Sequence, residues 1–401
     1  MNILDRLWRI SRIASLAALT APAALGCASS SNNGAADAGA APQADGAAGG
    51  VSALGFTPSN IDLDGIDLSN LRDFVVDSST CTIDSAELLA SCGDGGNILR
   101  FKLASQLGGG KVAVYVARNI KIPGGMTLTA QGLNPIVLVA LGTIEIGGKL
   151  VARAAGNVAG PGGQKSPTLA NVPGEGPGAG GAGYQAAGSG AGYCGGGGRG
   201  APETGNPTEG GKSFGLATIT PLVGGSSGGS GDPGAGGAGG GGVQLVAGTS
   251  ITVEPGASIN VGGGGGGFGG STGNEQEASG GGSGGAILLE SPIVNLGGTL
   301  AANGGGGGGG TSMNDPSGQD GTASTEGAPG GNGGVSPGGE GAASLTINGK
   351  DGSDTPGNSA GGGGGGAGRI RINTKNGQAV IVGAQFSPAS STECVTQGTV
   401  K

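Results

Sequence analysis

The sequence contains no histidine, and aromatic residues make up only 2% of the chain. The absence of histidine removes the usual acid–base group near neutral pH, the commonest zinc ligand and every histidine-activated nucleophile. Charged residues are also scarce, at 11%, and the net charge is -8. Because there is no basic patch with interleaved aromatic residues, we do not expect nucleic-acid binding. Glycine is abundant instead, at 102 of 401 residues, but without the strict three-residue period of collagen.

The N-terminus has the pattern of an export signal. Three arginines within the first twelve residues precede the stretch IASLAALTAPAAL, which is too short to span a bilayer as a mature helix. The residues Ala24-Leu25-Gly26-Cys27 follow and resemble the bacterial lipobox, in which the cysteine thiol takes the lipid. We therefore predict a signal peptide over 1–26 and lipidation of Cys27. The alternative is ordinary cleavage nearby, for instance after Ala23, which leaves Cys27 an unmodified thiol.

The segment 27–54 is rich in alanine, serine and glycine, so it has almost no side chain that could build a core. We predict a disordered tether between the lipidated cysteine and the folded part. Ala28, and not an aspartate, follows the cysteine, which resembles the sorting pattern of outer-membrane lipoproteins. The predicted location is therefore an outer-membrane lipoprotein or the cell surface, with the membrane as a partner through the lipid anchor.

Four windows of the chain share one spacing. Each starts with an apolar run, continues eight residues later with a pair of aliphatic residues, turns at glycine and enters a third alternating stretch. The windows are VAVYVARNIKI from Val112, IVLVALGTIEI from Ile136, VQLVAGTSITV from Val243 and AILLESPIVNL from Ala286. The first two begin 24 residues apart, which suits a triangular turn of three strands.

We therefore predict an all-β fold, a right-handed parallel β-solenoid over 111–401. Stacking of the turns about 4.8 Å apart would bury aliphatic ladders. The predicted inward ladders are Ile120, Ile144, Ile251 and Val294 on one side, and Leu128, Leu150, Ile259 and Leu300 on another. The stretch from Gly368 resembles a degenerate last turn, and 55–110 is predicted to cap the N-terminal end. Within the cap, Asp84 and Glu87 suggest one or two helical turns.

Long glycine-rich insertions lie at about 157–241, 262–284 and 304–367, and each falls between the third strand of one turn and the first strand of the next. Insertions at a single corner leave the stacking register intact, because the cost of closing a loop grows slowly with its length. Composition favours solvated loops without fixed structure. The alternative is that they lie against the solenoid as extended, polyproline-II-like strands, because the lack of a Cβ allows close backbone approach.

The outward faces of the predicted strands differ in character. On the first strand they are apolar, at Val137, Val139, Val246, Ile287 and Leu289, which predicts that another segment covers them. On the third strand they are polar, and this surface is the candidate ligand face. Its residues are Thr127, Thr129, Lys149, Arg153, Ser258, Asn260, Thr299 and Asn303.

Four cysteines follow Cys27, an even number that suggests disulfides in an exported chain. Cys81 and Cys92 close a short loop and are the favoured pair; a pairing of Cys194 with Cys394 is left open. A cysteine metal site is the weaker interpretation, because no CxxC spacing is present.

No catalytic, metal or cofactor site is predicted. Lys121 and Glu145 lie on neighbouring turns and suggest a surface ion pair. Asp62, Asp64 and Asp67 could be paired carboxylates or calcium ligands, but the solvent face of an alternating cap strand is the favoured interpretation.

The whole pattern, including PIVLVALGTIEIGGKLVARA and GGAILLESPIVNLGGTLAANGGGGGG, resembles the glycine-rich predicted surface lipoproteins of myxobacteria over about residues 70–375. That resemblance implies architecture and location but no activity. The leading hypothesis is a non-enzymatic, lipid-anchored cell-surface protein with a structural or adhesive role, in contact with extracellular polysaccharide. The alternative is a carbohydrate-active β-helix enzyme, a polysaccharide lyase or glycosidase.

Overall fold

A computed structural model of the chain describes residues 53–79, 81–92, 99–106, 108–183, 185–269, 277–310, 317–334, 336–355 and 359–401. All of them belong to one compact unit, Gly46–Lys401. The predicted signal peptide, Cys27 and nearly all of the predicted tether lie outside the described residues.

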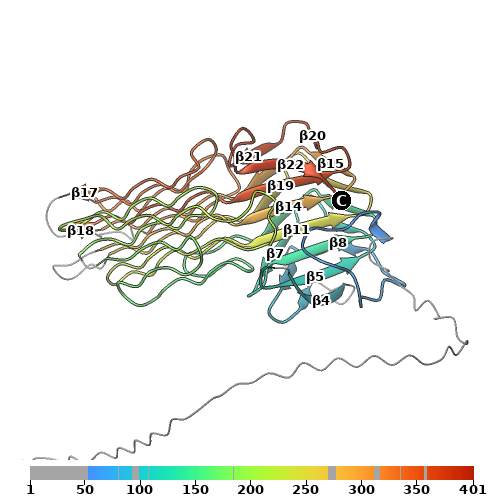
Figure 1. The fold of residues 1–401 in the computed structure, drawn as a ribbon, viewed down its shortest axis with the longest axis horizontal. Helices are drawn as coiled ribbons and strands as arrows, with labels where there is room; N and C mark the ends of the chain where they lie inside the picture. Colours follow the sequence, from blue (N-terminus) through green and yellow to red (C-terminus); the bar gives the residue numbers. More distant parts are fainter. Residues whose placement is uncertain are drawn as a thin grey trace, which may run out of the picture. The chain divides into compact units, whose positions relative to one another are not determined.

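Three sheets form the strand-rich part of the unit (Figure 1). The first sheet has the order β22 (Val395–Thr399), β19 (Arg369–Thr374), β14 (Ala286–Glu290), β11 (Gly242–Ala247), β8 (Ile136–Ala140), β5 (Lys111–Ala117) and β4 (Arg100–Ser105). The second has the order β1 (Phe74–Val75), β6 (Ile120–Ile122), β9 (Thr143–Ile146), β12 (Ser250–Val253), β15 (Ile293–Leu296) and β20 (Val380–Ile381). The third has the order β21 (Gln385–Ser387), β16 (Thr299–Ala301), β13 (Ser258–Asn260), β10 (Lys149–Val151), β7 (Thr127–Gln131), β2 (Cys81–Asp84) and β3 (Leu89–Ser91).

Each turn of the chain contributes one strand to each sheet, and successive turns pair in parallel. Ile144 aligns with Ile120 and Ile251 in the second sheet. Leu150 aligns with Leu128 and Ile259 in the third. These side chains are at most 1% exposed and belong to one aliphatic cluster between the sheets. The predicted parallel β-solenoid and its inward ladders are confirmed, and β19, β20 and β21 form the predicted last turn.

The register of the first strands differs from the prediction in two turns. Ile136 pairs with Ala113 and Val243, and Val243 pairs with Ile287. The windows that start at Val112 and Ala286 are therefore offset by one residue, because the corner between the first and second strands is one residue shorter in those turns. A shift of one residue reverses the face of a strand. Ile287 and Leu289 consequently point into the aliphatic core and not outward as predicted.

The N-terminal end of the solenoid carries two antiparallel strands, β3 beside β2 and β4 beside β5. The helical turns predicted around Asp84 are wrong, because β2 and β3 form a hairpin there. Asp84 instead accepts hydrogen bonds from the backbone N–H groups of Ala86 and Glu87 in the connecting turn.

The outward face of the first sheet is covered, as its apolar residues predict. Val137, Val139 and Val246 are fully buried in a second cluster with the N-terminal segment around Phe56 and Leu63. The cluster also takes in side chains of the first insertion, Tyr193, Ile219 and Leu222.

A buried carboxylate fixes the covering N-terminal segment. Glu290, 1% exposed, accepts hydrogen bonds from the backbone N–H and hydroxyl of Ser59, from the Gln244 amide and from the Asn373 amide. A buried carboxylate without such donors would be strongly destabilising, so this cluster ties the segment to three neighbouring strands.

The three glycine-rich insertions all leave from the predicted corner, between β10 and β11, β13 and β14, and β16 and β19. The last contains a small antiparallel pair, β17 (Asp354–Thr355) and β18 (Ser359–Ala360). Figure 1 shows the insertions as extended traces that run side by side away from the three sheets, with β17 and β18 near their far end. The favoured interpretation as solvated loops is wrong: residues 278–285 and 304–310 are buried throughout.

Backbone hydrogen bonds order these insertions in a repeat of three residues. Segment 278–285 donates in rotation to three neighbours: Ser279, Gly282 and Gly285 to 261–267, Gly280 and Ser283 to 226–229, and Gly281 and Gly284 to 363–366. It accepts hydrogen bonds from three others, 188–191, 237–240 and 305–308. Three residues per turn is the repeat of a polyproline-II-like helix. We call this bundle of segments the glycine array; it satisfies the backbone groups that water would otherwise have to pair.

Close packing explains the residue type. A Cβ built on Gly281 would overlap the carbonyl oxygen of Gly305, and one on Gly190 would overlap that of Gly364. In the outer segment 349–353 only every third residue faces inward, at Gly349 and Gly352, while Lys350, Asp351 and Ser353 are exposed. A segment with a three-residue repeat has three faces, and each face that packs against a neighbouring segment requires glycine. Segments with more buried faces therefore contain more glycine.

This packing predicts that Gly281→Ala destabilises the protein, by about 1–3 kcal/mol in the free energy of unfolding, because backbone atoms must move to admit a methyl group. The matched control is Gly110→Ala, since a Cβ on Gly110 meets no atom within 4 Å. Urea unfolding of both variants measures the difference. Equal midpoints for the two would contradict close packing of the array.

Candidate functional site

The structure contains two disulfides, Cys81–Cys92 and Cys194–Cys394. The first is the pair that short spacing favoured, and it closes the β2–β3 hairpin. The second joins residues 200 positions apart and links the glycine array to the segment that precedes β22. It resolves the pairing that the sequence left open.

Part of the candidate ligand face forms a continuous polar row on the third sheet. Lys149 aligns with Thr127 on one side and Ser258 on the other, and Ser258 aligns with Thr299. Lys149 is exposed, Thr127 and Thr299 are half-buried and Ser258 is buried. Thr129 lies further along β7 and is also half-buried.

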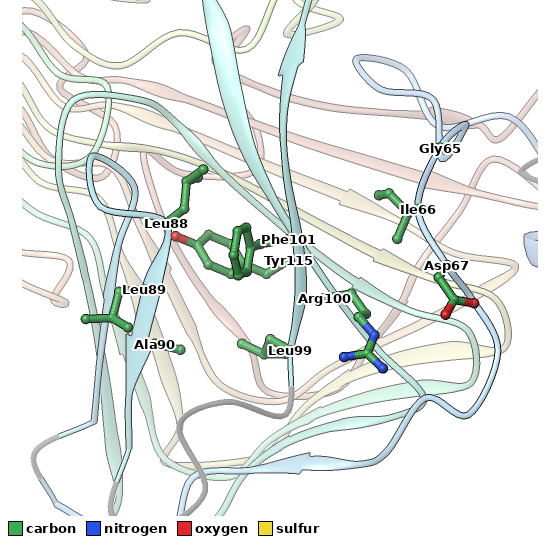
Figure 2. A pocket seen from close by; sticks show the side chains of 10 residues that line it. All are labelled: Gly65, Ile66, Asp67, Leu88, Leu89, Ala90, Leu99, Arg100, Phe101 and Tyr115. Carbon is green, nitrogen blue, oxygen red and sulfur yellow. The ribbon is translucent and has the colours of Figure 1, made fainter.

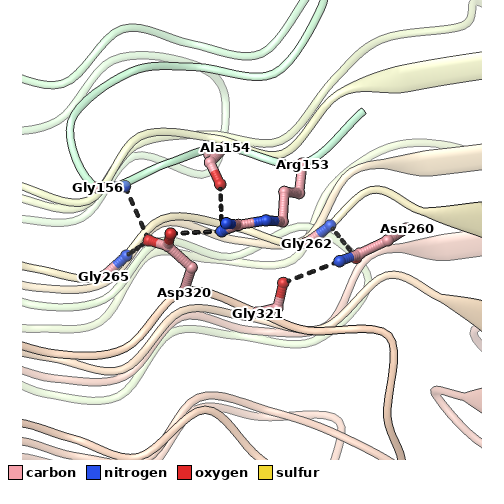
Figure 3. A network of polar contacts seen from close by, with 8 residues as sticks. All are labelled: Arg153, Ala154, Gly156, Asn260, Gly262, Gly265, Asp320 and Gly321. Atoms are coloured by element: carbon pink, nitrogen blue, oxygen red, sulfur yellow. Dashed lines mark hydrogen bonds and ion pairs between the residues drawn. The ribbon is translucent and has the colours of Figure 1, made fainter. Parts of the chain in front are cut away.

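The rest of the predicted face is used inside the protein (Figure 3). Arg153 pairs with Asp320, whose other carboxylate oxygen accepts hydrogen bonds from the N–H groups of Gly156, at 2.8 Å, and Gly265, at 3.0 Å. Asn260 donates to the carbonyl of Gly321 at 3.2 Å.

Asn303 donates to the carbonyls of Thr322 and Ser324. The third insertion thus folds back over Arg153, Asn260 and Asn303, so these three do not form a ligand surface with the others. The sequence pattern could not reveal this, because it does not show where an insertion returns.

The charged residues that the sequence analysis considered as ligands or catalytic groups form ion pairs and hydrogen bonds within the protein. Lys121 and Glu145 form the expected ion pair between neighbouring turns, with 2.9 Å between Nζ and Oε2. Asp62 pairs with Lys102 at 2.8 Å. Asp67 accepts hydrogen bonds from the hydroxyl and the N–H of Ser69, which lower its pKa. Among the described residues, no group of three or more His, Cys, Asp or Glu side chains could hold a metal ion.

A cavity of about 420 Å³ lies at the N-terminal end of the solenoid, between β3, β4 and the covering segment (Figure 2). Its lining is mostly aliphatic and aromatic, including Leu88, Leu99 and Phe101. Arg100 and Asp67 lie together on one side of it in this view. It offers an apolar surface at the open end of the core but no set of polar groups aimed at one point.

A larger groove, of about 930 Å³, lies where the third sheet meets the glycine array. We call it the seam groove. One wall comes from the solenoid, with Asp84 at the end of β2 and Gln131 at the end of β7. The other comes from the start of the first insertion, with Gln164, Lys165 and Glu175. Gln131 extends the outward-facing row of Thr127 and Thr129, so the groove continues the exposed part of the predicted ligand face.

Asp84 is held rigidly at the edge of this groove. Its Oδ2 accepts a hydrogen bond from Gln131 Nε2 at 2.9 Å, and its backbone carbonyl accepts one from the hydroxyl of Tyr115 at 2.8 Å. Partial burial opposes ionisation, but the hydrogen bonds from Gln131, Ala86 and Glu87 outweigh it, so the pKa of Asp84 lies below its ordinary value. Asp84 is therefore an ionised acceptor near neutral pH and unsuited to act as a general acid.

Neither periodicity nor spacing predicts the seam groove. The sequence suggested only that Asp84 begins a helical turn. Glu175 lies in the first insertion, which was predicted to be a solvated loop. The sequence predicted no catalytic site, whereas the structure brings Asp84 and Glu175 to the lining of the same groove.

Comparison with models of protein families, with curated proteins and with solved structures finds no match to this chain. In the part of the chain that the structure describes, no helix is both long and apolar enough to cross a bilayer. The fold and the geometry of the groove therefore carry the functional argument.

The Gln131 hydrogen bond predicts that Gln131→Ala raises the pKa of Asp84, because a donor to the carboxylate is lost. The lowered pKa also means that this carboxylate stabilises the folded chain above its unfolded-state pKa of about 3.9, and that the contribution disappears as the pH falls through the folded-state pKa. NMR titration of the Asp84 carboxyl measures the change. Thr129→Ala, on the same strand face, is the control, and an equal shift in both variants would contradict the assignment.

The long-range disulfide predicts that Cys194→Ser with Cys394→Ser lowers the free energy of unfolding by about 2–5 kcal/mol, since the bond restricts the unfolded chain over a long loop. Peptide mapping without reductant should recover both linked pairs. A smaller loss is expected for Cys81→Ser with Cys92→Ser, whose loop is short. Free thiols at residues 194 and 394 in the oxidised protein would contradict the pairing.

Proposed function

We propose that this chain is a non-enzymatic, lipid-anchored cell-surface protein with a structural or adhesive role, and that it contacts extracellular polysaccharide. The observation that carries the proposal is the glycine array. Backbone hydrogen bonds in three directions hold an insertion-built body rigid beside the solenoid, which suits a projecting surface element better than a mobile linker.

Two further observations support an extracytoplasmic setting. The described residues contain two disulfides, which persist in oxidising compartments. The N-terminal sequence ALGC, with its preceding apolar stretch, is typical of export and lipidation. The resemblance to glycine-rich surface lipoproteins of myxobacteria agrees with the same location.

A carbohydrate-active enzyme is the second candidate, because Asp84 and Glu175 share the seam groove. Hydrolysis through paired carboxylates requires one of them to donate a proton. The lowered pKa of Asp84 argues against that role for Asp84. Glu145 is engaged with Lys121 on the second sheet and lacks a second acid partner among the described residues of that row.

Deletion of the gene in its host should reduce surface adhesion and retention of extracellular polysaccharide, and the wild-type gene should restore both. Cys27→Ser should restore neither, because the protein would lose its membrane anchor. Mass spectrometry of the mature N-terminus should find a diacylated or triacylated Cys27. Full adhesion in the deletion strain would contradict the proposed role.

Purified protein should show no turnover of neutral or acidic polysaccharides. Turnover that Glu175→Gln or Asp84→Asn abolishes, while Glu145→Gln leaves it intact, would favour the enzyme.

A further inference from the structure

The seam groove has two walls that are fixed by different parts of the fold. On the solenoid wall, the turn after β2 is tied to the loop after β7: Asn134 donates through its backbone N–H to the hydroxyl of Ser85 at 3.0 Å, and through its side-chain amide to the Ser85 carbonyl at 3.2 Å. A Cβ on Gly132 would lie 2.6 Å from Ser85 Oγ and 2.8 Å from Asp84 Oδ1. Asp84 is thus packed as well as hydrogen-bonded.

The array wall is fixed through its backbone. The N–H of Gln164 donates to the carbonyl of Gly225 at 2.9 Å, and the Gln164 carbonyl accepts from Gly239 at 3.0 Å. The N–H of Glu175 donates to the hydroxyl of Ser227 at 2.7 Å. The side chains of Gln164, Lys165 and Glu175 therefore project from a rigid backbone, which lowers the ordering cost when a ligand binds.

The polar groups of the groove suit hydroxyl groups. Asp84 is an ionised acceptor. Gln131 uses one of its two amide hydrogens on Asp84, which leaves a second donor and a carbonyl acceptor on an exposed side chain. A carboxylate and an amide held side by side present acceptors and donors to adjacent hydroxyls of a sugar ring. Gln164 adds a second amide side chain on the array wall, whereas the hydroxyl of Ser166 donates to the Gly236 carbonyl.

The groove also contains exposed aliphatic surface. Leu133 and Val158 line it and are 66% and 65% exposed. Exposed apolar residues beside convergent polar groups mark binding sites. The C–H faces of sugar rings are apolar, so such side chains can pack against them while the ring hydroxyls meet the polar groups.

The charge of the groove lining favours uncharged ligands over anionic ones. Asp84 and Glu175 face the groove against the single lysine Lys165, so the charges of its lining sum to a negative value. A polyanion such as a polyuronate or a nucleic acid would be repelled, whereas an uncharged polyol is not.

We propose that the seam groove binds a neutral polysaccharide chain, with Asp84 and Gln131 bound to sugar hydroxyls and Leu133 packed against a ring face. The inference rests on the proposed surface role and gives it a binding site. The proposed site differs from the candidate ligand face predicted from the sequence. Of that face, only the row of Thr127 and Thr129 on β7 continues through Gln131 into the groove.

Isothermal titration calorimetry of the full mature chain with neutral hexasaccharides of glucose, mannose and galactose tests the inference, with hexagalacturonate as the polyanion. At least one neutral hexasaccharide should bind. Gln131→Ala should weaken that binding about tenfold, because it removes direct hydrogen bonds and one partner of Asp84. Leu133→Asp should weaken it further, and hexagalacturonate should bind poorly.

The matched control is Gln385→Ala, an exposed glutamine at the far end of the third sheet, which should leave affinity unchanged. Circular dichroism melting of each variant separates loss of binding from loss of fold. Binding that Gln131→Ala and Leu133→Asp leave unchanged overturns the groove while the surface role stands. Absence of binding by the wild type, or tighter binding of hexagalacturonate, also overturns it; the proposed surface role is judged separately by the deletion strain.

Discussion

Backbone hydrogen bonding between glycine segments is the constraint on which the structure depends. A buried peptide must pair its N–H and C=O groups, and a segment with a three-residue repeat pairs them with neighbours in three directions. Such segments approach closely only where no Cβ intervenes, as at Gly281 and Gly190. Glycine loses the most conformational entropy on ordering, so the segments are stable as an array and not singly. The long glycine tracts follow from this geometry.

The molecule therefore has two interiors with different packing rules. Aliphatic side chains such as Ile120, Ile144 and Ile251 fill the interior of the solenoid. In the glycine array, backbone atoms of neighbouring segments pack directly against one another. They meet at one corner of each turn, and the Cys194–Cys394 disulfide and the side chain of Tyr193 link them again at the first sheet. The seam groove is bordered by rigid walls on both sides.

Sequence patterns predicted what depends on side-chain periodicity. Ile144 and Leu150 lie where the alternation placed them, because an inward position is visible as an aliphatic residue. The register at Ala286 was missed, since a corner shorter by one residue leaves no mark in composition. Ordered glycine segments were only the alternative prediction, placed against the solenoid and not in an array, because glycine has no side chain whose periodicity could report burial. Only outer segments show such a periodicity, as at Gly349 and Gly352. The seam groove was missed because Asp84 and Glu175 come together through an insertion whose path the sequence does not encode locally.

Hydrogen exchange of the glycine amides tests the central claim most directly. The amides of 278–285 should exchange as slowly as those of β11 and β14, because each donates to a backbone carbonyl of another segment. Exchange of 278–285 at the rate of an unstructured peptide, beside protected strands, would contradict the account.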